Sequence, residues 1–183
     1  MKRNRMRSSA AVRTLPLLAA LVVASDARAQ APDPLRDELL MQFETSMEKF
    51  IALANAIPAE RYTWSPGEGV MEVGHVFMHV ARYNYMYPSN NMGVPAPAGV
   101  ELGRMEAVRD KEQVVRALEQ SRAYVREAIA GMTAAELAQP TRLYGRDVAR
   151  WAVLVQLVAQ MNEHLGQSIA YARMNRIVPP WSS

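Results

Sequence analysis

The chain contains no cysteine and only three histidines among its 183 residues. The absence of cysteine excludes disulfide bonds, thiolate metal ligands, a cysteine nucleophile and a lipid-modified N-terminal cysteine. The sequence also lacks a Ser-His-Asp arrangement, a phosphate-binding loop, a pair of catalytic carboxylates and a dinucleotide-binding fingerprint. Any transition-metal site in this protein must therefore depend on its few imidazoles.

The sequence also lacks an apolar run long enough to cross a membrane. Residues 15–24 (LPLLAALVVA) are apolar, but a spanning helix needs roughly 20 such residues. This run follows a basic segment and precedes Ala27-Arg28-Ala29, which is the pattern of a cleaved secretory signal. We predict a signal peptide over residues 1–29, cleavage after Ala29 and a mature domain over residues 30–183. The protein would then be exported, periplasmic or extracellular, and free of the membrane; a retained membrane anchor is the alternative.

The positive charge of the chain is concentrated in this N-terminal segment. Residues 1–29 hold six of the 21 Lys and Arg residues and one of the 18 Asp and Glu residues. Cleavage would change the formal net charge from +3 to −2. Nucleic acid is therefore excluded as an expected partner, because its binding depends on a basic surface.

The mature sequence predicts an all-α fold, an up-down four-helix bundle. Apolar residues recur at helical spacing in four segments, and no long segment alternates like a strand. Asp33 is the expected N-cap of the first helix, and T-x-x-E at residues 133–136 fits a capping box. Residues 140–147 form a polar connection with some strand-like residues. The predicted helices cover residues 34–56, 70–87 (ending before Pro88), 110–132 and about 148–176.

The three histidines are distributed over two of these helices. His75 and His79 lie one turn apart on one face of the second helix, and His164 lies inside the last helix. Facing helices of a bundle can bring such side chains together, and three imidazoles with an open position suit a divalent cation such as zinc. The spacing equally fits histidines that are buried and satisfied by ordinary hydrogen bonds.

The residues around the histidines resemble the DinB / YfiT-like superfamily, and in particular its exported bacterial members. The strongest part is the run H-x-G-Q-x-x-x-Y-x-R-M-N that begins at His164. The resemblance implies a four-helix bundle, usually a homodimer, with a divalent metal (Zn, Ni or Mn) held by three histidines. The matching segments are Trp64-Ser65-Pro66, residues 76–81 (VFMHVA), residues 162–175 (NEHLGQSIAYARMN) and residues 178–182 (VPPWS).

The sequence departs from this family pattern at one expected metal ligand. His79 matches the ligand of the second helix, and His164 matches the second member of an H-x-x-x-H pair whose first member falls at Gln160. An amide oxygen is a weaker ligand than imidazole for zinc-like ions. Either the site is degenerate and binds metal weakly or not at all, or His75 supplies the missing nitrogen.

The resemblance leaves two classes of function open. One is a metal-dependent hydrolase or transferase that acts on an unidentified small molecule, although export disfavours a cytosolic thiol cofactor. The other is a non-catalytic bundle that binds a small molecule or a protein. The sequence assigns no catalytic residue and no organic cofactor. We also expect Gly166 to permit the close approach of another helix, and Gln167 to be buried and hydrogen-bonded.

Overall fold

The structure, a computed structural model, describes residues 33–182. The predicted signal peptide lies outside the described residues. No helix within residues 33–182 is long and apolar enough to cross a membrane. The four long helices are α1 (Pro34–Ala56), α2 (Val73–Asn91), α4 (Lys111–Ala130) and α6 (Arg150–Met174).

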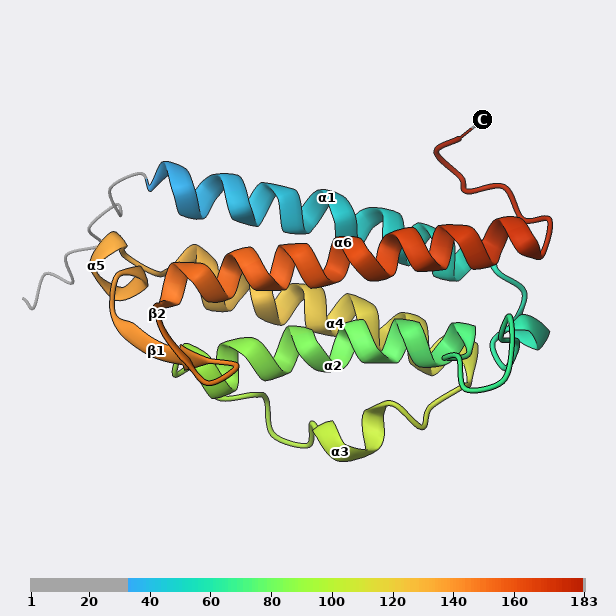
Figure 1. Ribbon diagram of the computed structural model, residues 1–183, viewed down its shortest axis with the longest axis horizontal. Helices are drawn as coiled ribbons and strands as arrows, with labels where there is room; N and C mark the ends of the chain where they lie inside the picture. Colours follow the sequence, from blue (N-terminus) through green and yellow to red (C-terminus); the bar gives the residue numbers. More distant parts are fainter. Residues whose placement is uncertain (1–32, 183) are drawn as a thin grey trace, which may run out of the picture.

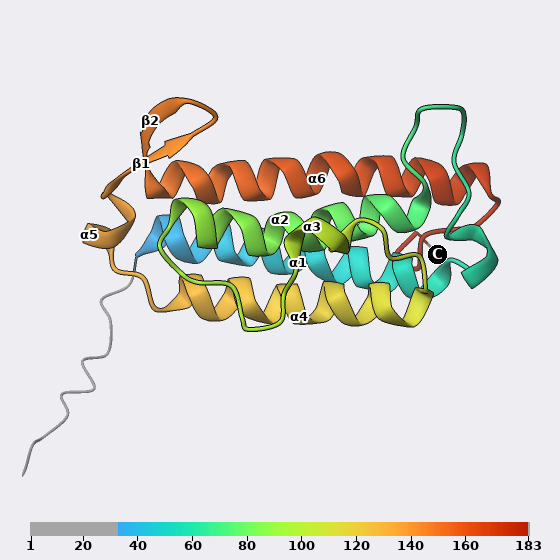
Figure 2. The same cartoon turned by 90° about the horizontal axis from the view of Figure 1, so that it is seen from below.

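The predicted four-helix bundle is confirmed (Figure 1). Helices α1 and α6 run in one direction, and α2 and α4 run in the other, because the connection between α2 and α4 returns along the length of the bundle (Figures 1 and 2). Lys111 at the start of α4 donates to the carbonyl oxygens of Asn55 and Ile57 at the end of α1. Arg36 at the start of α1 donates to the carbonyl oxygen of Met132, just after α4.

Short elements occupy the connections between the long helices. The strands form an antiparallel hairpin in which Pro140 pairs with Ala149 and Leu143 with Arg146. Its two turn residues, Tyr144 and Gly145, have φ angles of 50° and 79°, as a type I′ turn requires. The short elements are η1 (Ala59–Arg61), α3 (Leu102–Met105), α5 (Ala134–Leu137), β1 (Pro140–Leu143) and β2 (Arg146–Ala149).

Local capping explains where several helices begin. The Asp33 carboxylate accepts hydrogen bonds from the backbone N–H groups of Leu35 and Arg36, as predicted. Thr133 and Glu136 form the predicted capping box at the start of α5. Such bonds satisfy N–H groups that have no partner inside the helix.

Helix α2 differs from the prediction at both ends. It begins at Val73 rather than near residue 70, because the N–H groups of Val73 and Gly74 donate to the carbonyl oxygens of Trp64 and Tyr62 in the preceding loop. It also continues through Pro88 to Asn91, so the prediction that it stops before Pro88 is wrong. Proline removes one N–H donor, but in the last helical turn this affects a single bond and does not block the following residues.

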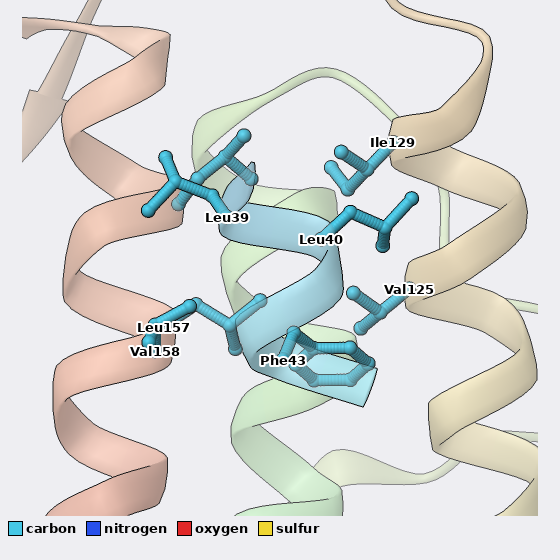
Figure 3. Close-up of a pocket in the computed structure, with 8 residues that line it drawn as sticks. Leu39, Leu40, Phe43, Val125, Ile129, Leu157 and Val158 are labelled. Carbon is cyan, nitrogen blue, oxygen red and sulfur yellow. The ribbon is translucent and has the colours of Figure 1, made fainter. Parts of the chain in front are cut away.

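The core is closely packed along the bundle axis. Phe50 of α1 and Phe77 of α2 meet edge to face with their ring centres 5.7 Å apart. Towards the other end of the bundle, apolar side chains of α1, α4 and α6 surround a gap of about 10 Å³ (Figure 3). A gap of this size and polarity does not hold an ordered water molecule, so the bundle interior offers no ligand site there.

Candidate metal site between α2 and α6

A carboxylate lies between the two histidines of α2. Glu106 follows α3, and its Oε1 lies 2.7 Å from His79 Nδ1 while its Oε2 lies 3.5 Å from His75 Nε2. The three side chains are half-buried, and one ligand atom from each lies within 4.8 Å of the others. This His-His-Glu cluster has the donor types that divalent cations accept.

Arg82 and the position of α3 hold Glu106 in place. Arg82 lies one helical turn beyond His79, and its Nη1 lies 3.4 Å from Glu106 Oε1. The Nε of Arg82 donates to the carbonyl oxygen of Leu102 at the start of α3. One side chain of α2 therefore binds both the carboxylate and the segment that carries it.

His164 approaches His79 from α6. The centres of the two rings lie 4.8 Å apart and the ring planes are 76° from parallel. His164 Nδ1 lies 2.9 Å from Gln167 Oε1, and Gln167 Nε2 donates to the hydroxyl of Tyr171. An amide oxygen only accepts, so His164 donates from Nδ1 in this arrangement, and Nε2 is the ring nitrogen that this bond does not use.

The electrostatic surroundings favour a neutral His79 beside an ionised Glu106. Burial lowers the pKa of His79; the hydrogen bond to Glu106 opposes this shift, and the nearby His164 and His75 add to it. Burial acts to raise the pKa of Glu106, but His79, Arg82 and His75 outweigh it and lower that pKa. A neutral imidazole that donates Nδ1–H to a carboxylate retains a lone pair on Nε2.

The sequence matches the DinB superfamily over residues 42–172. The chain belongs to the DinB superfamily. No curated protein matches it. Its fold is similar to that of a DinB-like protein from Bacillus cereus, with a TM-score of 0.69 and 16% sequence identity. That similarity covers 79% of this chain and 95% of the other.

Two further solved structures share the fold of this DinB-superfamily protein. A DinB-like protein from Bacillus subtilis gives a TM-score of 0.52 at 17% identity and covers 76% of this chain and 92% of the other. A mycothiol-dependent maleylpyruvate isomerase gives a TM-score of 0.57 at 16% identity. The latter match covers 73% of this chain and 60% of the isomerase chain, and at this identity it supports a shared fold alone.

Gln160, where the resemblance predicts a histidine, is buried without a hydrogen-bond partner among the described residues. Neither its Oε1 nor its Nε2 finds one among the described residues. The hydroxyl of Ser168, one turn beyond His164, is in the same condition. Buried polar groups are rarely left unpaired. The unpaired atoms of Gln160 and Ser168 lie on either side of His164 along α6, where a bound ion or ligand would supply the missing partner.

The sequence identified the histidines but not the carboxylate between them. The structure brings His164 beside His79, and it brings His75 beside Glu106, with the ring centres of His75 and His79 6.5 Å apart. The ligation of a metal by His75, His79 and His164 stays a prediction. Glu106 lies 27 residues after His79 on an irregular connection, and no spacing rule in the sequence pointed to it.

Proposed function

We propose that this DinB-superfamily protein binds a divalent cation of the Zn, Ni or Mn class between His79 of α2 and His164 of α6. The observation that carries the proposal is the orientation of both rings. Each Nδ1 is hydrogen-bonded to an oxygen, of Glu106 or of Gln167, which leaves both Nε2 lone pairs for a ligand. Metal-binding histidines are typically oriented by such a bond from the second ring nitrogen.

The distance between the rings supports a shared ion. Two imidazoles that bind one tetrahedral ion through nitrogens at roughly 2.0–2.1 Å have ring centres about 5 Å apart. The measured distance between the centres of His79 and His164 is 4.8 Å. The near-perpendicular ring planes also keep the two imidazoles from stacking.

Gln160 is the third ligand of this proposal. It lies one turn before His164 on α6, where the family pattern has a histidine, and its buried Oε1 has no other partner among the described residues. An amide oxygen binds zinc-like ions more weakly than imidazole and suits harder ions such as Mn²⁺ better. With glutamine in place of histidine at residue 160, we expect the site to bind zinc-like ions more weakly and to accept harder ions such as Mn²⁺ as well.

The reaction that fits this site is a metal-assisted hydrolysis or group transfer on a small molecule. A divalent cation polarises an oxygen of the substrate and makes a water molecule more acidic. In this chain, Glu106 orients the His79 ring, His79 and Arg82 together lower the pKa of Glu106 and so keep it ionised, and Gln167 orients the ring of His164. The non-catalytic binding bundle is the alternative, favoured by the loss of a histidine at Gln160.

The proposal is tested by calorimetric titration of metal-free protein with Zn²⁺, Ni²⁺ and Mn²⁺. His79→Ala and His164→Ala should abolish binding, and Glu106→Gln should weaken it about 10–100-fold because it only orients a ligand. His75→Ala is the matched control and should bind as the wild type does. If His75→Ala abolishes binding and His164→Ala does not, the His75, His79 and Glu106 cluster holds the ion and the proposal is wrong. If the wild-type protein binds none of these cations, the metal-binding proposal is wrong and the non-catalytic binding bundle is favoured.

We further propose that the protein acts outside the cytoplasm. The support is the basic segment, the apolar run and the small residues that precede Gln30. N-terminal sequencing of the protein recovered from its native host should begin at Gln30. Recovery of the intact N-terminus in a soluble cell extract would contradict the proposal.

A further inference from the structure

The connection between α2 and α4 leaves two adjoining cavities between itself and α4. Figure 2 shows this connection crossing the side of the bundle where α2 and α4 lie next to each other. The cavities have volumes of about 460 Å³ and about 310 Å³, and small-molecule sites typically measure roughly 300–1,000 Å³. Both cavities are lined by the same four residues and so form one groove, here called the α4 groove: Tyr85, Gly99, Val100 and Gln120.

Hydrogen bonds fix the walls of the α4 groove. The Tyr124 hydroxyl of α4 donates to the carbonyl oxygen of Val94 at 2.7 Å, which ties the beginning of the connection to α4. The N–H of Val100 donates to the carbonyl oxygen of Pro97. Gly99, between them, has a φ angle of 88°, as the third residue of a type II turn requires. A ligand therefore meets a groove that is already formed, which lowers the entropic cost of binding.

Tyr85 brings a polar atom to the groove that the rest of the described chain does not use. Its side chain is buried, with 4% exposed, and its ring packs against that of Tyr124 with the centres 5.1 Å apart. The Tyr85 hydroxyl has no hydrogen-bond partner among the described residues. A buried tyrosine hydroxyl usually has one. Because Tyr85 lines both cavities, a ligand in the groove can supply this partner.

The charged side chains that line the groove favour a cation. Two of them neutralise each other, since Arg104 Nη1 lies 3.1 Å from Glu101 Oε2. Glu127 lines the larger cavity, and its carboxylate has no ion pair or hydrogen bond with a described residue. No lysine or arginine is among the residues that line this larger cavity. The carboxylate therefore remains free for an ammonium group, which only donates hydrogen bonds.

The smaller cavity offers an apolar surface at the other end of the groove. Met78 of α2, Met105 and Val108 of the connection and Ala117 of α4 line it. Ala117 lies ten residues before Glu127 on α4, a distance of about 15 Å along the helix. The α4 groove thus joins an acidic end to an apolar end, which suits an elongated molecule with one charged group.

We propose that the α4 groove binds an amphipathic organic amine, with its ammonium group at Glu127 and its apolar body in the cavity beside Met105 and Ala117. The Tyr85 hydroxyl is a second acceptor for the ammonium group, since it lines the same cavity as Glu127. Burial of the apolar body drives binding. No residue that lines the groove is a ligand of the proposed metal site, so this proposal does not depend on metal binding.

The first test compares three probes that share a phenylbutyl body and differ in charge: phenylbutylamine, phenylbutanol and phenylbutyrate. Each is titrated into protein with isotope-labelled tyrosine rings and followed by NMR, and Tyr→Phe variants assign the seven tyrosines of the chain. The amine should bind with a Kd of about 1 mM, as expected for a ligand of this size. It should bind about tenfold more tightly than phenylbutyrate, with the largest changes at Tyr85 and Tyr124. No binding of the amine at ten times this concentration, equal binding of phenylbutyrate, or changes confined to the other tyrosines would overturn the proposal.

The second test uses variants of the lining residues, with circular dichroism to check that each is folded. Glu127→Gln should weaken binding of the amine about fivefold, as the loss of an exposed ion pair does, and leave that of phenylbutanol unchanged. Glu119→Gln, the same change at an exposed position of α4 outside both cavities, is the matched control and should bind as the wild type does. Tyr85→Phe removes the hydroxyl alone and should weaken binding of the amine about two- to tenfold, with Tyr124 as the reporter. Equal effects of Glu127→Gln and Glu119→Gln, or unchanged binding in Tyr85→Phe, would show that the groove does not bind amines in this way.

Discussion

Replacing Gln160 by methionine should stabilise the metal-free protein. The Gln160 side chain is buried, and neither of its polar atoms finds a hydrogen-bond partner among the described residues. An unpaired buried polar group costs about 1–3 kcal/mol, and methionine has nearly the same length and volume. We expect the free energy of unfolding to rise by about 1–3 kcal/mol, which for a domain of this size raises Tm by about 2–4 °C per kcal/mol.

The assay is urea denaturation in the presence of a chelator, with an unchanged m-value as the sign that the same surface unfolds. Gln156→Met is the matched control one turn earlier on α6. Gln156 hydrogen-bonds Tyr87, so its replacement should destabilise the protein by about 0.5–1.5 kcal/mol. Gln160→Met should also bind divalent cations more weakly than the wild type. A Gln160→Met protein that is destabilised as much as Gln156→Met would show that the Gln160 amide has a hydrogen-bond partner in the native protein.

Three further changes test the packing and the electrostatics of the bundle. Ser121→Ala removes the oxygen that accepts from Asn84 at 3.0 Å in the core and should cost about 1–3 kcal/mol in urea denaturation. The Phe77 ring is fully buried, so Phe77→Ala leaves a cavity in the core and should lower the free energy of unfolding by about 3–5 kcal/mol in the same assay. Backbone and side-chain hydrogen bonds from Thr133 lower the pKa of Glu136. The ionised Glu136 carboxylate therefore stabilises the folded protein fully above the pKa of the unfolded state, and this stabilisation is lost as the pH falls through the pKa of the folded state. Thermal unfolding should therefore depend less on pH below about pH 5 in Glu136→Gln than in the wild type.

The helical framework was predictable because it is encoded locally. The N-cap at Asp33 and the apolar spacing that follows it predicted a helix over residues 34–56, and α1 has these limits. The capping box at Thr133 was equally readable, since it depends on residues three apart. The end of α2 could not be predicted in this way, because a helix can continue for three residues beyond a proline in its last turn, as α2 does beyond Pro88.

The site was predictable only where bundle geometry constrains it. A histidine on each of two long helices predicted that His79 and His164 could meet, and their rings are neighbours. Glu106 lies on the connection between α2 and α4, and its position follows from the path of that connection back along the bundle (Figure 1). The orientation of the His164 ring depends on the hydrogen bond to Gln167, which becomes visible once the side chains are placed.

The most direct test of the metal site is nitrogen NMR of the histidine rings in metal-free protein during titration with Zn²⁺. The whole chain has three histidines, so His→Ala variants assign every ring signal. We predict protonated Nδ1 and unprotonated Nε2 atoms in His79 and His164, and a change at both Nε2 signals on binding while the His75 signals stay unchanged. A change at His75 with none at His164 would mean that the ion does not lie between His79 and His164.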